Sequence, residues 1–206
     1  MKRSLTDFRK VFVAALVVLF AVSASVAQVQ TDKKLTEPIG TKSVWQGQSG
    51  PSIVDTAIAL NSEGPFAGQF DTLIAAVLAA EPFVATTLSG QGQFTVFAPT
   101  DDAFALLGIT PDNVGMLDQG FLTDVLLYHV APGRRYAADV LDSYRIRTIS
   151  KGFLFQDNGV LTDALGREAN IIATDVEARN GVIHAIDAVV LPYAPTAAAA
   201  GTRLGK

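Results

Sequence analysis

The fold is decided by residues 94–104, Phe-Thr-Val-Phe-Ala-Pro-Thr-Asp-Asp-Ala-Phe. The first five residues are mostly β-branched or aromatic, a composition typical of a buried strand. Pro99 ends that strand, and Thr100 or Asp101 can act as the N-cap of a helix that starts immediately afterwards. The two aspartates at the helix start also complement the helix dipole. We therefore expect a buried strand that leads directly into a short capped helix.

Helical periodicity lies on both sides of this stretch. Apolar residues recur at helical spacing in residues 53–60, and residues 71–80 form the clearest predicted helix. Asp71 is the expected N-cap of this second helix, Pro82 limits it, and its expected apolar face consists of Leu73, Ile74, Val77 and Leu78. We further expect a polar, glycine-rich turn at 86–93, a short helix with Pro111 at its first position, and an amphipathic helix at 121–129.

The last third of the chain has the period of strands. Residues 145–149 alternate, and two Asn-Gly pairs are flanked by apolar residues. They predict two hairpins: residues 153–155 with 160–162 across Asn158-Gly159, and residues 171–176 with 182–191 across Asn180-Gly181. Asn-Gly favours a type I′ turn, in which both central residues have positive φ. Helices followed by strands, without regular βαβ alternation or an internal repeat, predict one α+β module with an antiparallel or mixed sheet.

The two ends differ from this module. Basic residues between Lys2 and Lys10, an apolar run from Val11 to Val22 and small residues up to Ala27 predict a signal peptide over residues 1–27, cleaved before Gln28. The apolar run is shorter than the ~20 residues that span a bilayer, so we expect no membrane span after cleavage. Residues 28–52 are expected to form a flexible linker or arm, residues 53–193 the folded domain and residues 194–206 a disordered tail.

Charge and cysteine content exclude several classes of protein. The chain has a formal charge of −4, and the predicted signal peptide carries +3, so the remainder carries −4 − 3 = −7. Such an acidic protein lacks the basic stripe that nucleic-acid binding requires. The chain has no cysteine, so an exported domain must be stabilised by apolar packing alone, as fits a bacterial protein.

Three segments together resemble the fasciclin (FAS1) family. Residues 94–104 are similar to its first signature block, Leu126-Leu127-Tyr128-His129-Val130 to its central Tyr-His block, and residues 180–192, Asn-Gly-Val-Ile-His-Ala-Ile-Asp-Ala-Val-Val-Leu-Pro, to its second signature block. The resemblance runs from about Ile53 to Tyr193. It implies a wedge-shaped β-sandwich with several helices packed around it. It also implies an extracellular or periplasmic location and a role in adhesion, matrix assembly or cell-surface interaction, without a cofactor or catalysis.

The residues themselves indicate no catalytic or metal site. His129 and His184 are the only histidines, and they lack the close spacing and cysteine partners of a zinc site. Each is therefore expected to be a hydrogen-bonded structural residue. The chain has no Gly-x-Ser-x-Gly elbow, no His-Glu-x-x-His motif and no cysteine nucleophile. Adjacent Asp101 and Asp102 point apart and are explained by helix capping. We expect no enzyme activity, no cofactor and no bound metal.

Two functions are compatible with these features. The first is an exported FAS1 module that binds a protein or polysaccharide of the cell surface or extracellular space; the resemblance assigns Tyr128 and His129 as its binding residues. Core packing is the alternative role for this pair, because their helix has apolar neighbours such as Leu122 and Val125. The second function is a periplasmic or secreted binding protein for a small apolar ligand. An apolar pocket of a few hundred Å³ would favour that alternative.

Overall fold

The structure, a computed structural model, describes residues 50–195. The predicted signal peptide, nearly all of the predicted linker and residues 196–206 of the predicted tail lie outside the described residues. The elements run in the order α1 (Ile53–Ser62), α2 (Asp71–Ala79), α3 (Pro82–Ser89), β1 (Phe94–Pro99), α4 (Asp101–Ala105), the 3₁₀ helix η1 (Val114–Met116), α5 (Gln119–Tyr128), β2 (Val130–Pro132), α6 (Ala137–Leu141), β3 (Arg145–Arg147), β4 (Phe153–Asp157), β5 (Val160–Thr162), β6 (Glu168–Ala178) and β7 (Gly181–Ile186).

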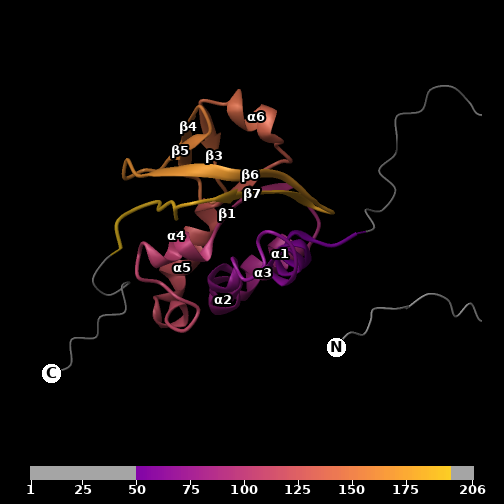
Figure 1. The fold of residues 1–206 in the computed structure, drawn as a ribbon. Coiled ribbons are helices and arrows are strands. Elements are labelled where there is room, and N and C mark those ends of the chain that lie inside the picture. The colour runs from indigo at the N-terminus through magenta and orange to yellow at the C-terminus, as the bar shows by residue number, and fades with distance from the viewer. Residues whose placement is uncertain (1–49, 196–206) are drawn as a thin grey trace, which may run out of the picture. The chain divides into compact units, whose positions relative to one another are not determined.

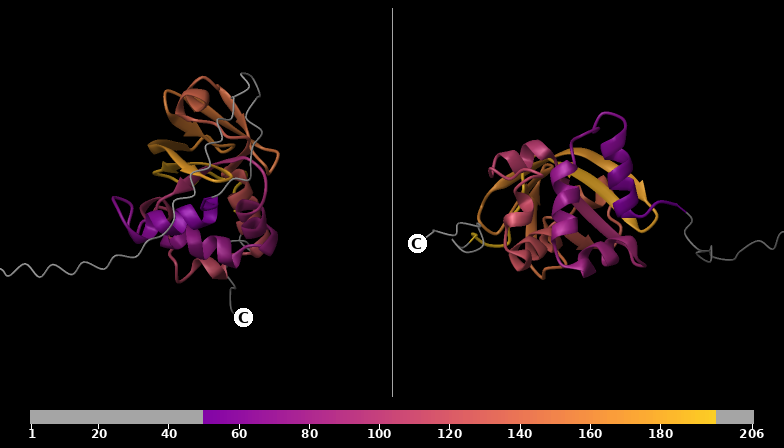
Figure 2. Two further views of the ribbon diagram at one scale, coloured as in Figure 1. Left: turned by 90° about the vertical axis from the view of Figure 1, so that its right-hand side faces the viewer. Right: turned by 90° about the horizontal axis from the view of Figure 1, so that it is seen from below.

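The strands form one mixed sheet in the order β2-β1-β7-β6-β5-β4-β3. The β1–β7 pair is parallel, from Phe94 opposite Gly181 to Pro99 opposite Ile186, and the other pairs are antiparallel. Strands β3 to β5 lie over β6 and β7, while helices α1 to α5 lie on the other side (Figure 1). The indigo and magenta helices cross that face of the sheet in the right-hand view of Figure 2. The expected α+β sandwich with packed helices is confirmed.

Two apolar cores follow from this arrangement, because side chains alternate along each strand. In β1, Val96 and Ala98 point into the core between the helices and the sheet. Phe97 points into the core between the two halves of the sheet, with Leu154 and Leu161. The two outermost strands approach each other there, since Ile149 N–H, two residues beyond β3, donates to the Val130 carbonyl of β2 at 2.7 Å.

The start of α2 differs from the expectation that Asp71 caps it. Phe70 occupies the N-cap position, and the Asp71 carboxylate accepts instead from Asn61 Nδ2 at 2.7 Å. Asp101, the first residue of α4, accepts the Thr72 N–H at 2.8 Å. Thr100 caps α4, as predicted, by accepting from Ala103 N. A side chain 29 residues away in the sequence therefore satisfies the first turn of α2.

Three further expectations were wrong in detail. The buried face of α2 consists of Thr72, Leu73 and Ala76, whereas Leu78 is 78% exposed, because the helices and sheet cover α2 along only a narrow strip. Residues 86–89 are helical rather than a turn, since Pro82 begins α3 at its first helical position. Pro111 leads only into a turn and the three-residue η1.

The two Asn-Gly pairs have different structures. Asn158 and Gly159 both have positive φ, of 49° and 88°, so the β4–β5 hairpin has the predicted turn. The β6–β7 turn is formed by Arg179 and Asn180 instead, and Gly181 already belongs to β7. A Cβ atom at Gly181 would overlap the Phe94 carbonyl oxygen, so this glycine permits β1 and β7 to approach closely.

Asn180 stays in the turn, which lies one residue earlier than expected, and its amide holds three elements together. Its side chain, on a residue that is 1% exposed, accepts from Ile53 N at the start of α1 at 2.8 Å. It donates to Leu88 O at 2.7 Å and to Gly90 O at 3.2 Å, at the end of α3. Its backbone carbonyl accepts from Phe94 N at 3.0 Å, where β1 begins.

We predict that Asn180→Ala lowers the free energy of unfolding by about 2–4 kcal/mol, because it leaves buried backbone groups of α1 and α3 without partners. Urea denaturation measures this change. Asn170→Ala is the matched control, since that side chain is exposed and bonds only to Asp187; it should cost less than about 1 kcal/mol. Equal losses for the two variants would contradict the role assigned to Asn180.

Candidate binding site

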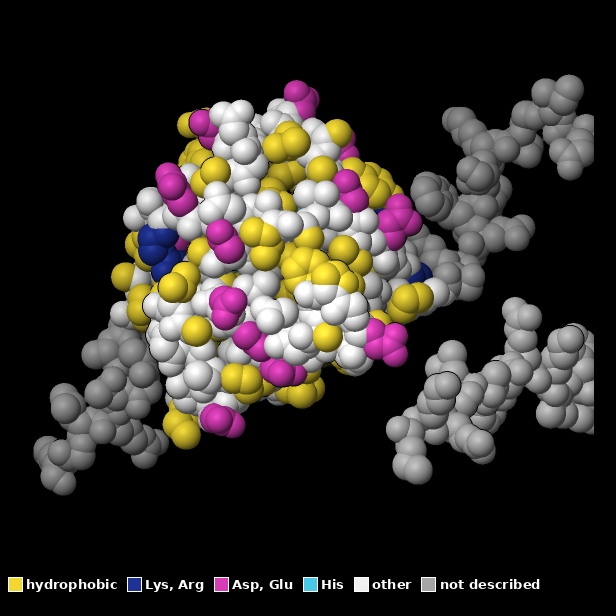
Figure 3. Space-filling model, in the orientation of Figure 1, with side chains coloured by type: hydrophobic (Ala, Val, Ile, Leu, Met, Phe, Trp, Pro, Cys, Tyr) yellow, Lys and Arg dark blue, Asp and Glu magenta, His cyan; other side chains and the backbone are white. Residues whose placement is uncertain are grey.

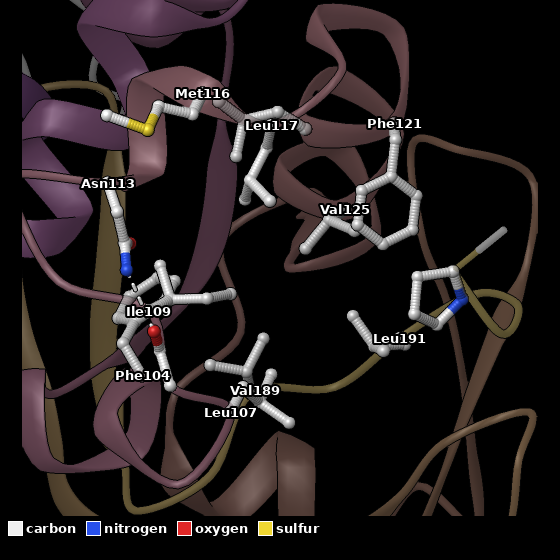
Figure 4. A pocket seen from close by; sticks show the side chains of 13 residues that line it. Phe104, Leu107, Ile109, Asn113, Met116, Leu117, Phe121, Val125, Val189 and Leu191 are labelled. Carbon is white, nitrogen blue, oxygen red and sulfur yellow. Dashed lines mark hydrogen bonds between the residues drawn. The ribbon is translucent and has the colours of Figure 1, made fainter. Parts of the chain in front are cut away.

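A hollow of about 310 Å³ lies between the α4–η1 loop, α5 and the segment that follows β7. Leu117 and Val125 face Val189 and Leu191 across it (Figure 4). We call it the α4–α5 groove; its lining residues are Phe104, Leu107, Gly108, Ile109, Asn113, Met116, Leu117, Phe121, Leu122, Val125, Val189, Leu191 and Pro195.

The loop wall of the groove is shaped by its own hydrogen bonds. Gly108 turns the chain after α4 with a φ of +70°, a conformation that favours glycine. Asn113 Oδ1 accepts from Thr110 N at 2.8 Å, and its Nδ2 donates to Gly108 O at 2.9 Å. Asn113 is the one polar side chain of the lining with a hydrogen-bonding group, and both ends of its amide are occupied by the loop. The groove therefore offers an apolar surface.

The opposite wall, residues 189–193, is anchored at successive positions. Burial opposes the charge of the Asp163 carboxylate, but hydrogen bonds from Leu191 and Arg167 hold its pKa below the usual value. The Tyr193 ring also packs edge-on against Phe121, with ring centres 5.7 Å apart. The anchoring hydrogen bonds are Arg167 Nη2 to Val189 O at 2.9 Å, Val190 N to His129 Nε2 at 3.2 Å, Leu191 N to Asp163 Oδ2 at 2.9 Å and Tyr193 Oη to Asp124 Oδ2 at 2.7 Å.

The surroundings of the groove are apolar and acidic. Leu106 and Met116 are 76% and 74% exposed, although both are large apolar side chains. Residues 50–133 contain nine carboxylates and no Lys or Arg, and all seven cations of residues 50–195 lie between Arg134 and Arg179. Figure 3 shows carboxylates spread over the whole of the face that it presents, its lower, helical part included, with Lys and Arg visible only at the left and right edges. A ligand of this face meets apolar side chains surrounded by negative charge.

A second, smaller hollow of about 150 Å³ lies between α1, α2, α3 and β1. Its lining is almost entirely apolar, and His129 is among the lining residues. Ile58 and Leu78, also part of the lining, are the most exposed of its large side chains.

Tyr128 and His129, the binding residues that the family resemblance assigns, lie inside the domain. Tyr128 is fully buried; its hydroxyl donates to Phe153 O at 2.6 Å and accepts from Ala164 N at 3.1 Å. His129 is 3% exposed. Because Val190 N–H donates to Nε2, the ring proton lies on Nδ1, which donates to Val125 O at 2.8 Å. Their binding role stays a prediction, and their visible contacts are structural.

His184 is also buried and hydrogen bonded at both ring nitrogens. Asp175 N–H donates to Nδ1 at 3.3 Å, so Nε2 carries the proton and donates to Arg135 O at 2.9 Å. The ring stacks on Phe97 of the neighbouring parallel strand, with centres 5.7 Å apart. This histidine ties β6, β7 and the segment before α6 together.

No three His, Cys, Asp or Glu side chains of residues 50–195 gather in a way that could hold a metal ion. No single helix in this range is long and apolar enough to cross a membrane; α2 and α3 reach that length and composition only as a pair bent by 117°.

Burial lowers the pKa of His129 to about 4, below the value of about 6.5 expected in the unfolded chain. The unfolded state therefore binds a proton first as the pH falls, so stability is lost between about pH 6.5 and 4. We predict a loss of about 3 kcal/mol from this residue. Urea denaturation at pH 7, 5.5 and 4 should show a weaker pH dependence for His129→Gln than for the wild type. Parallel curves would disprove the assignment.

The hydrogen bond to Asp124, together with burial and the negative charge of that carboxylate, raises the pKa of Tyr193 to about 12. We predict that Asp124→Asn lowers this pKa toward the ordinary tyrosine value of about 10, because the amide carries no charge. Ultraviolet absorbance between pH 8 and 13 measures it, with Tyr193→Phe identifying the signal by subtraction. An unchanged titration in Asp124→Asn would mean that the wall is not anchored through this pair.

Comparison with known proteins identifies the family. The fasciclin domain matches residues 68–192. Protein sll1483 of Synechocystis sp. is 41% identical over 127 residues, 60% of this chain and 67% of that protein. Protein sll1735 of the same organism is 37% identical over 147 residues, 68% of this chain and 98% of that protein. A solved FAS1 domain pair from the insect cell adhesion molecule fasciclin I is 22% identical, covers 60% of this chain and 45% of that one, and has a TM-score of 0.47. The chain described here belongs to the fasciclin domain family.

Proposed function

We propose that the chain is an exported, non-catalytic adhesion module that binds an extracellular protein through the α4–α5 groove. The observation that carries this proposal is an apolar hollow of about 310 Å³ with exposed apolar side chains at its rim. Exposed contiguous apolar surface on a domain of this kind marks a site of interaction. Binding a partner removes Leu107 and Met116, two exposed side chains of the lining, from water, which is favourable by about 25 cal/mol per Å² of apolar surface.

The chemistry of the groove selects the kind of partner. A protein can insert one apolar side chain as an anchor and place Lys or Arg beside the surrounding carboxylates. A polysaccharide depends on hydrogen bonds, and the only amide of the lining, that of Asn113, already bonds within its own loop. We therefore favour a protein segment with an apolar anchor and flanking positive charges.

Export of the chain is supported by the pattern of residues 1–27, in which basic, apolar and small residues follow one another as in a signal peptide. Membership of the fasciclin domain family supports the same location, because the resemblance implies an extracellular or periplasmic role. Both features agree with a module that is secreted or displayed on the cell surface.

His129 contributes to binding in this proposal as a positioning residue. Its Nε2 accepts from Val190 N, and the residues on either side of Val190 line the groove. Tyr128 lies farther from the groove than His129 does, since its hydroxyl bonds to the backbone of Phe153 and Ala164 in the sandwich. The Tyr-His pair thus supports a binding wall without touching the partner.

A small apolar ligand is the second candidate, because the volume of the groove lies at the lower end of the usual range for ligand pockets, about 300–1,000 Å³. Such pockets usually add a few convergent polar groups that orient the ligand. The one side-chain amide of this lining, that of Asn113, bonds to its own loop through both its oxygen and its nitrogen, so we favour an anchoring side chain of a protein.

We predict that Met116→Asp and Leu107→Asp each reduce attachment of the source organism's cells to the immobilised chain at least about fivefold, since a buried charge opposes an apolar anchor. Ile172→Asp is the matched control, because Ile172 of β6 is 49% exposed and lies outside the groove; it should attach like the wild type. Attachment is counted under flow, and circular dichroism checks that each variant is folded.

Equal attachment of the groove variants and the wild type would refute the proposed site. Native mass spectrometry separates the second candidate: a bound mass of a few hundred daltons that disappears in Val125→Trp, which fills the groove, would favour the small ligand. If the wild-type chain carries no such bound mass, the result supports a protein partner.

A further inference from the structure

We propose that the outer face of strands β3 and β4 binds a polysaccharide that carries carboxylate groups. We call this surface the aromatic–arginine face; its side chains are Tyr144, Arg145, Arg147, Phe153 and Phe155. Strands β3 and β4 lie on the side of β6 and β7 away from helices α1 to α5 (Figure 1), and none of these five residues lines the α4–α5 groove. The face is therefore a second surface, separate from the groove.

Strand alternation and register place these side chains together. Ile146, the middle residue of β3, is fully buried in the core between the two halves of the sheet. Since successive side chains point to opposite faces of a strand, Arg145 and Arg147 point outward. On β4, Phe155 lies opposite Arg145, and Phe153 lies opposite Arg147. Two arginines thus face two aromatic side chains across one pair of strands.

The rings of this face are held by contacts with each other and with an arginine. The guanidinium carbon of Arg145 lies 4.4 Å from the centre of the Phe153 ring, as in a cation–π contact. The rings of Tyr144 and Phe155 have centres 5.8 Å apart and are tilted by 59°. Tyr144 is nevertheless 74% exposed, and Phe155 is 37% exposed. Both side chains therefore offer positioned ring surface to a ligand.

Positive charge is concentrated at this face. Residues 143–156 contain Arg145, Arg147 and Lys151 and no carboxylate. Residues 50–195 as a whole contain 7 cations and 17 carboxylates, a net charge of 7 − 17 = −10. Among the residues that the structure describes, the one ion pair joins Arg167 to Asp163, so none of the three cations of 143–156 is neutralised by such a pair. An anionic ligand finds here the positive charge that the rest of the domain lacks.

Three carboxylates lie at the margins of the face. Asp142 precedes β3 by three residues, and Asp157 is the last residue of β4. Glu168 of β6 is separated from Phe155 by Thr162 of β5. A ligand that lies along β3 and the first half of β4 therefore meets the arginines and not these acidic side chains.

These features specify the chemistry of the ligand. An arginine guanidinium can donate two parallel hydrogen bonds to one carboxylate. The apolar C–H face of a sugar ring packs on an aromatic side chain, and the Tyr144 hydroxyl can bond a sugar hydroxyl. The Cα atoms of Arg145 and Arg147, two residues apart on one strand, are separated by about 7 Å, so the two can bind different carboxylates of one chain. A polysaccharide with carboxylate groups supplies both kinds of contact.

A single-stranded nucleic acid also combines rings with negative charge, but it fits this domain less well. Each nucleotide carries a phosphate, so the net charge of −10 repels such a strand more strongly than a polysaccharide with fewer charges. The export that we propose also brings the chain to extracellular polysaccharides. This preference for a polysaccharide rests in part on the proposed function, whereas the anionic character of the ligand does not.

Carboxymethyl-dextran and unmodified dextran test the proposal, because they share one backbone and differ in charge. Biolayer interferometry with the immobilised chain from Gln28 to Lys206 should show binding of carboxymethyl-dextran at low salt. Binding should weaken at least about tenfold at about 0.5 M salt, where charges are screened. Unmodified dextran should bind at least about tenfold more weakly at low salt.

Single substitutions test the assigned side chains. Arg145→Gln and Arg147→Gln should each weaken binding of carboxymethyl-dextran at least about threefold, because each removes a charged fork. Arg179→Gln is the matched control, since it removes the same charge from the β6–β7 turn; it should change binding by less than about 1.5-fold. Tyr144→Ala should also weaken binding at least about threefold, whereas Tyr144→Phe keeps the ring and should bind within about twofold of the wild type. Circular dichroism checks that each variant is folded.

Four outcomes overturn the inference: no binding of carboxymethyl-dextran, equal binding of dextran, equal effects of Arg179→Gln and the two variants of β3, or tighter binding of oligothymidylate at the same salt concentration. The last outcome would assign the face to nucleic acid. Because the assay contains no protein partner, its failure leaves the α4–α5 groove untouched. Failure of the cell-attachment assay likewise leaves binding of carboxymethyl-dextran as an independent result.

Discussion

The side-chain amide of Asn180 is the contact on which the rest of the domain depends. It joins the first residue of α1, the end of α3 and, through its backbone, the first residue of β1. Because Gly181 follows immediately, the same turn also begins the parallel β1–β7 pair. The helical core and the sandwich core share these two strands, with Val96 pointing into one and Phe97 into the other. A single buried amide therefore sets the position of both halves of the structure.

The sequence predicted correctly those elements that are determined by residues close together in the chain. Residues 94–104 contain both a strand and the cap of the next helix, and Asn158-Gly159 has the backbone that its turn requires. The predictions that were wrong concern positions where a residue far away in the sequence determines the local structure. Asp101 satisfies the first turn of α2. The Asn180 side chain bonds to partners about 90 and 127 residues away, in a turn that lies one residue earlier than expected. No local pattern reports such contacts, and the pattern in residues 137–141 gave no sign of α6.

The candidate site was harder to predict than the fold. The family block pointed to Tyr128 and His129, yet both are buried. The groove is lined by the loop after α4, by α5 and by a segment that follows that loop by more than 70 residues. Two signals were present in the sequence. Leu106 and Leu107 extend an apolar run beyond a short helix, and residues 50–133 carry no cation. These signals became informative only when the fold placed them on one face, with Val189 and Leu191 opposite.

The parallel pairing of β1 with β7 also has a consequence for the order of events during synthesis. Strand β1 gains its parallel neighbour only when residues 181–186 lie beside it, 87 positions later in the chain. Until the ribosome has made that last strand, β1 and β2 are not joined to the rest of the sheet, and the surface that buries the apolar faces of α1 to α5 is incomplete. In the export that we propose, this delay keeps the domain unfolded, and so able to pass through a narrow channel, until almost all of residues 50–195 have been translated.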